Sequence, residues 1–138
     1  MNTMITYMYR DGSNYKIHCE EVIHGTLTKQ EIAEIVAISV LCGNGTPFDA
    51  ITEADIDEMS DYLETDMSDC YFYPEVCGLP APTFVSEGYA PYEDDPDWHE
   101  LCEITETDRK PTCEVSAAEF LAAFRNRSAV KSGKLVGV

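Results

Sequence analysis

The chain has 138 residues and a formal net charge of −17, from 26 acidic and 9 basic side chains. Hydrophobic residues make up 44% of it, enough for the core of one ordinary domain. This charge excludes direct binding to nucleic acid or to an anionic membrane, because Lys and Arg supply the attraction to phosphate. No apolar run approaches the roughly 20 residues of a membrane span, and no export signal opens the chain, so we expect a cytoplasmic protein.

The first part of the chain predicts a β-hairpin. Residues 3–9 (TMITYMY) are rich in aromatic and β-branched side chains, which favour a strand. Asp11 and Gly12 follow as a typical hairpin turn, and residues 15–24 (YKIHCEEVIH) return to the strand pattern. We therefore expect two antiparallel strands on either side of this turn.

Three capping boxes predict three helices, since in each a Ser or Thr and an acidic side chain three residues on satisfy each other's backbone amides. They are Thr28 with Glu31, Thr52 with Asp55, and Ser116 with Glu119. The first helix has an apolar face over residues 32–40. The second runs to about Thr65 and is acidic on one side, and the third turns Phe120 and Phe124 inward.

The remaining pattern is β-like and fixes the expected fold class. Strands are predicted at residues 71–73, 83–86 and 98–104. The element order predicts one α+β domain over residues 1–127, an antiparallel β-sheet with two to three helices packed on it. Residues 128–138 lack periodicity and are predicted to form a mobile C-terminal tail.

The charges are distributed very unevenly. Residues 30–108 contain 21 carboxylates and no Lys or Arg, whereas residues 109–138 carry a net +4 and the first 29 residues are neutral. Surfaces normally intersperse both signs, because like charges repel one another in the compact state. An acidic span of this length therefore indicates either a function or a lineage with acidic proteins.

Aromatic residues accompany the carboxylates between Tyr71 and Trp98. Tyr and Trp anchor many interfaces, and an aromatic ring among carboxylates suits an Arg side chain. Tyr89 and Tyr92, in a loop that contains Gly and Pro, are expected to be exposed. The predicted partner-binding residues are Asp55, Asp57, Glu58, Asp61, Glu64, Tyr89, Tyr92, Glu93, Asp94, Asp95 and Asp97.

The signals for catalysis or a metal cofactor are weak. Six cysteines without an export signal are expected to be reduced, and Cys19, Cys42 and Cys102 are expected to be small buried hydrophobes. The acidic loop around residues 94–100 is a conceivable divalent-cation site, although it lacks the EF-hand spacing. A pair of Cys102 with His99 or His18 stays open as a catalytic alternative, but no local catalytic signature supports it. We therefore expect no cofactor, no metal and no enzymatic activity.

Three stretches carry a resemblance. The sequences ITYMYRDGSNYK (residues 5–16), YFYPEVCGLP (71–80) and DDPDWHE (94–100) resemble small uncharacterised proteins of bacteria and their phages, over most of residues 4–104. That resemblance implies no particular activity. In size and acidity the chain is also similar to phage anti-CRISPR and anti-restriction proteins, several of which imitate DNA.

These observations lead to two hypotheses. The first is a non-enzymatic inhibitor of the anti-CRISPR or anti-defence kind, whose carboxylates imitate nucleic-acid charge and block a basic nucleic-acid-binding protein. The alternative is a small-ligand binder that sequesters a nucleotide second messenger in an aromatic pocket near Trp98, helped by Arg10, Lys16 or Arg109. The sequence does not indicate an oligomeric state.

Overall fold

Two paired strands open the chain, as the hairpin pattern predicted. The computed structural model describes residues 1–10, 16–43, 50–62, 70–82 and 98–130. In it β1 (Asn2–Arg10) pairs antiparallel with β2 (Lys16–Ile23). The register runs from Thr3 opposite Ile23 to Arg10 opposite Lys16.

Two later strands complete the sheet on the other side of β1. β4 (His99–Thr107) pairs antiparallel with β1, and the two-residue β3 (Tyr71–Phe72) pairs antiparallel with β4, which gives the order β2-β1-β4-β3. The register shifts where Thr6 faces Glu103 but Tyr7 faces Leu101. Cys102 is therefore the extra residue of a β-bulge.

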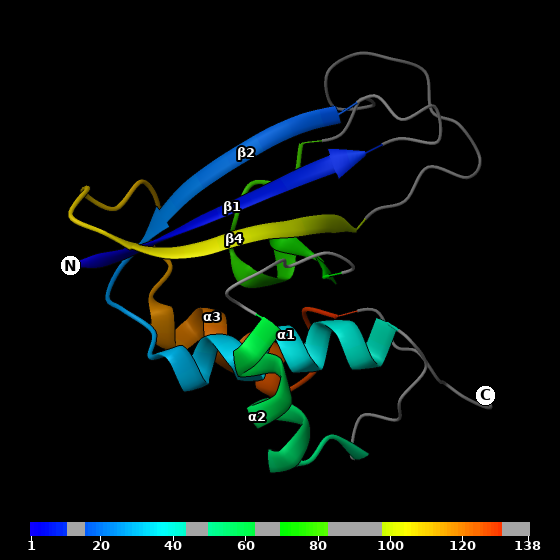
Figure 1. Cartoon of the computed structure of the whole chain (residues 1–138). Coiled ribbons are helices and arrows are strands. Elements are labelled where there is room, and N and C mark those ends of the chain that lie inside the picture. Colours follow the sequence, from blue (N-terminus) through cyan, green and yellow to red (C-terminus); the bar gives the residue numbers. More distant parts are fainter. Residues whose placement is uncertain (11–15, 44–49, 63–69, 83–97, 131–138) are drawn as a thin grey trace.

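Three helices form a second layer on one side of this sheet (Figure 1). They are α1 (Lys29–Gly43), α2 (Glu53–Tyr62) and α3 (Ala117–Arg125), and a short 3₁₀ helix, η2 (Pro74–Cys77), follows β3. α1 contacts both α2 and α3, and α2 lies on the side of α1 away from the sheet (Figure 1). The predicted α+β fold, with an antiparallel sheet and packed helices, is confirmed.

The core lies between the sheet and the α1–α3 layer. Three phenylalanine rings meet there: Phe72 lies 6.2 Å from Phe120 and 6.1 Å from Phe124, and the latter two are 5.1 Å apart, all between ring centroids. Other buried core residues are Ile5, Tyr7, Ile23, Ile35, Val36, Ile38, Leu101 and Leu121. None of the helices within the described ranges has the length and apolar composition needed to cross a bilayer.

The structure corrects two predictions about individual residues. Cys102 is exposed, because the bulge interrupts the inward–outward alternation of β4, whereas Cys19 is partly buried against the core as expected. Ala129 and Val130, predicted to lie in a tail, are buried in the core. They are held there because the Ala129 carbonyl accepts a hydrogen bond from the Tyr73 amide at 2.7 Å, so the predicted tail starts too early.

Several predictions fall outside the described residues. They are the turn at Asp11 and Gly12, the strand at 83–86, the loop that holds Tyr89 and Tyr92, the extension of the second helix to Thr65, the side chain of Cys42, and the tail beyond Val130.

Candidate functional site

Of the described helices and strands in the acidic span, α2 carries the most carboxylates. This helix begins with the predicted capping box: the Thr52 amide donates to the Asp55 carboxylate at 2.8 Å, and the Asp55 amide donates to the Thr52 hydroxyl at 3.3 Å. Ile56 and Met59 are partly buried, and Met59 packs against the core cluster. The helix therefore uses its apolar side for docking and leaves its acidic side to solvent.

The carboxylates of α2 are not equivalent. Asp55 also accepts a bond from the Thr52 hydroxyl at 3.0 Å and is half-buried, so it serves the helix cap. Glu53, Asp57 and Glu58 are exposed. Asp57 accepts a hydrogen bond of 3.3 Å from the Gln30 side-chain amide, which fixes it beside the first turn of α1. Asp57 and Glu58, with Glu53 beside them, are thus the best-placed residues for a partner.

Most of the other predicted partner-binding residues cannot be placed. The side chain of Asp61 on α2 lies outside the described part of the structure, as do Glu64, Tyr89, Tyr92, Glu93, Asp94, Asp95 and Asp97. The candidate site is therefore the exposed side of α2, and its predicted continuation over residues 89–97 stays a prediction.

Arginines from the ends of the chain neutralise carboxylates elsewhere in the acidic span. Arg10 pairs with Glu100 at 3.0 Å, and Arg125 binds Glu34 through two hydrogen bonds of 2.7 and 2.8 Å. The Arg125 guanidinium lowers the pKa of Glu34 through these bonds. Among the described residues no such ion pair includes Glu53, Asp55, Asp57 or Glu58 of α2, and three of these carboxylates are exposed to solvent.

The suggested Cys102–His99 pair does not form. His99 is buried between the rings of Tyr7 and Tyr9, with centroid distances of 5.9 and 5.3 Å. Its Nε2 donates to the Pro82 carbonyl at 3.1 Å, and its Nδ1 is buried without a hydrogen-bond partner among the described residues. Burial lowers the pKa of His99. Since Cys102 is exposed at the bulge, the two side chains lie in opposite environments.

The thiols inside the fold are poor nucleophiles. Burial raises the pKa of Cys77 to about 12 and that of Cys19 to about 11, so both are protonated at neutral pH. No group of three His, Cys, Asp or Glu side chains suited to a metal ion occurs in the ranges that the structure covers. The conceivable cation loop at residues 94–97 lies outside those ranges.

The basic residues named for the small-ligand alternative do not converge. Arg10 lies opposite Lys16 at one end of the hairpin. Arg109 lies at the other end, where it pairs with Glu20 and its Nη1 contacts the Met4 sulfur at 3.5 Å. Met4 and Arg10 are six positions apart along β1, which corresponds to about 20 Å. The described residues therefore do not bring the three basic groups to one pocket.

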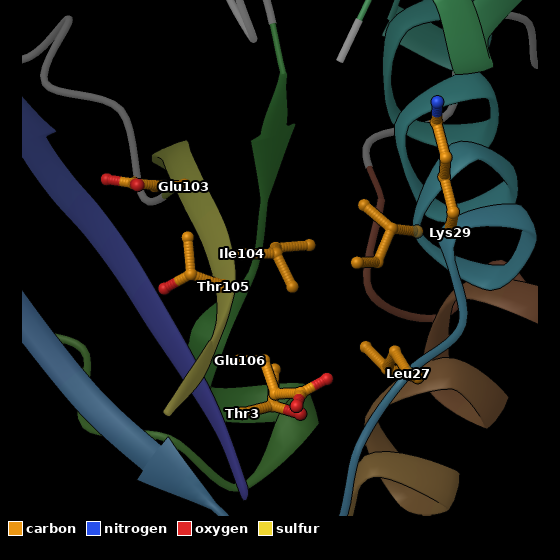
Figure 2. Close-up of a pocket in the computed structure, with 8 residues that line it drawn as sticks. Thr3, Leu27, Lys29, Glu103, Ile104, Thr105 and Glu106 are labelled. Carbon is orange, nitrogen blue, oxygen red and sulfur yellow. The ribbon is translucent and has the colours of Figure 1, made fainter. Parts of the chain in front are cut away.

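A pocket that the sequence did not predict lies between β4 and the start of α1 (Figure 2). Its volume is about 330 Å³. It is lined by Thr3, Leu27, Lys29, Ile32, Glu103, Ile104, Thr105 and Glu106. In the described part of the chain the short β3 pairs only with Glu100 and His99, so no described strand lies beside the part of β4 that lines this pocket.

Comparison with known proteins adds no relative: no protein-family model, curated protein or solved structure matches the chain.

Proposed function

We propose that this protein is a non-enzymatic acidic inhibitor that docks on a basic, nucleic-acid-binding protein in the cytoplasm and blocks it. Its carboxylates take the place of phosphates and compete for Lys and Arg side chains in the partner's groove. A phage-type inhibitor of a defence system, such as an anti-CRISPR protein, is the class of function that fits this chemistry.

The observation that carries this proposal is the charge of α2. Its exposed carboxylates Glu53, Asp57 and Glu58 lie on a helix that packs through its other side, and none of the ion pairs seen among the described residues includes them. Unpaired charge destabilises a compact chain through repulsion. A surface that keeps such charge together is therefore better explained by a partner of opposite sign than by the needs of folding.

A capture experiment with two matched variants tests the proposal. The site variant is Glu53→Gln with Asp57→Asn and Glu58→Gln. The control variant is Glu75→Gln with Asp108→Asn and Glu114→Gln, which removes the same charge from exposed positions elsewhere. Each protein is used to capture partners from a lysate of the cells in which it acts, at low and at moderate salt.

We expect the wild type and the control variant to retain one nucleic-acid-binding protein at low salt, and the site variant to bind it at least about tenfold more weakly. Binding should weaken as salt rises, because the contact is electrostatic. Duplex DNA or RNA added to the captured complex should displace the inhibitor. An equal loss of partner binding in both variants would show that net charge and not the α2 surface determines binding. Failure of nucleic acid to displace the inhibitor would refute mimicry of nucleic acid.

A further inference from the structure

One edge of β4 has no described strand beside it over about half of its length. β1 pairs with β4 as far as Thr107, but β3 pairs only with Glu100 and His99. Within the described ranges no strand adjoins the outer edge of residues 103–107. Such an edge presents backbone N–H and C=O groups over roughly 17 Å, the length of an average strand.

The unpredicted pocket follows this edge. Four consecutive residues of β4, from Glu103 to Glu106, line it. Side chains of a strand alternate between its faces, and Figure 2 shows Ile104 and Glu106 directed toward α1 while Glu103 and Thr105 point the other way. A cavity lined by residues that point to both faces of β4 reaches around the outer edge of this strand, and it also extends over the sheet to Thr3 of β1.

The opposite wall of the cavity comes from the segment that leads into α1. Leu27 and Ile32 are partly buried and pack against the core cluster, and Ile104 is 7% exposed, so the floor of the pocket is apolar. Glu103 and Glu106 are exposed at the rim. The edge pocket thus combines a strand edge, a place for an aliphatic side chain, two carboxylates on β4 and, on the wall that α1 forms, Lys29 (Figure 2).

We propose that the edge pocket binds an extended, basic segment of a partner protein as an added strand. Backbone hydrogen bonds to β4 hold the segment, an aliphatic side chain enters between Ile104 and Ile32, and neighbouring Lys or Arg side chains pair with Glu103 and Glu106. This surface is separate from α2, so the inference does not depend on the proposed function.

The charges of the edge favour a basic partner over a second copy of this chain. Pairing two copies through β4 would bring the carboxylates of Glu103 and Glu106 close to their counterparts, and like charges across paired strands are destabilising. Charged side chains are a common protection of sheet edges against self-association. The same two carboxylates that reject another copy attract a segment of opposite charge.

The test uses the full chain and the short blocked peptide Lys-Lys-Val-Lys-Lys, which as an added strand places its valine and two lysines on the face of Ile104 and Glu106 and the other two lysines on the face of Glu103. A control peptide of the same sequence is N-methylated throughout, so it keeps the charges and side chains but cannot donate backbone hydrogen bonds. We expect the first peptide to shift the NMR signals of residues 27–32 and 103–107 and to slow amide exchange along β4. The methylated peptide should bind at least about tenfold more weakly.

Two double variants with the same charge change locate the site. Glu103→Lys with Glu106→Lys should weaken peptide binding about tenfold or more, while Asp57→Lys with Glu58→Lys on α2 should change it less than about threefold. If the first variant fails to fold, Glu103→Gln with Glu106→Gln replaces it, with the same expected order. Equal binding of both peptides, shifts spread over α2, or concentration-dependent dimerisation through β4 would each overturn the inference.

Discussion

The helices α2 and α3 begin alike and take up different places in the molecule. Each starts with a capping box, which in α3 joins Ser116 and Glu119 through two hydrogen bonds of 3.1 Å. α3 then buries five of its nine residues, namely Ala117, Phe120, Leu121, Ala123 and Phe124. In α2 the described side chains are exposed or partly buried, and its principal contact is with α1.

The difference shows what each helix contributes to stability. The first turn of α3 is bonded to the segment that follows β2, because the Ala117 amide donates to the His24 carbonyl at 2.7 Å. The Phe120 and Phe124 rings of α3 also join the aromatic core. α2 has neither connection in the described structure. Capping sets where both helices begin, while apolar content decides which of them is part of the core. α2 is consequently free to carry charge at a small cost to the fold.

The largest expected effect is the loss of a core ring from α3. Phe124→Ala should lower the free energy of unfolding by about 3–5 kcal/mol, because it removes a fully buried ring that stacks on Phe72 and contacts Phe120. Met59→Ala in α2 should cost about 1 kcal/mol or less, since Met59 is only partly buried. Urea unfolding of both variants measures the two values. Similar losses would mean that α2 is as much a part of the core as α3.

The caps should give a smaller and more selective effect. Ser116→Ala should cost about 1 kcal/mol of global stability, because α3 unfolds only with the core. Thr52→Ala should cost less globally and instead speed amide hydrogen exchange within α2, which can open while the core stays folded. Thr52→Ser, which keeps the capping hydroxyl, is the control. Amide exchange in the Thr52→Ala variant that stays as slow in α2 as in α3 would contradict the idea that α2 opens while the core stays folded.

The comparison also shows which features the sequence predicts well. The three capping boxes at Thr28, Thr52 and Ser116 all form, because they depend on side chains only three residues apart. The hairpin and the inward phenylalanines of α3 are likewise confirmed, since their patterns have a local period.

Features that depend on distant contacts were missed. The bulge that exposes Cys102 arises from the register between β1 and β4, which the alternation within β4 alone does not reveal. The burial of Ala129 depends on its bond to Tyr73, far away along the chain. Of the candidate site, the acidic side of α2 was predicted correctly as a helix face, but the half-burial of Asp55 by its own cap and the pocket beside β4 were not.

The smallest effect that we expect is a change of folding stability with pH. It arises at His99, which is buried in the sheet and not on α2. Burial lowers the pKa of this imidazole below its ordinary value of 6.5, so the unfolded chain takes up a proton that the folded chain does not. The contribution of His99 to stability is therefore complete above about pH 6.5 and is lost progressively as the pH falls from there toward its lower folded pKa.

Unfolding in urea at a series of pH values from 7.5 to about 5 measures this loss, and the comparison of variants assigns it. His99→Phe should show a smaller decrease of stability on acidification than the wild type, even if it is less stable throughout because the Pro82 carbonyl loses its donor. His99→Gln, which keeps a donor, is the second variant if the first fails to fold. A decrease that persists unchanged without His99 would show that the buried imidazole is not its source.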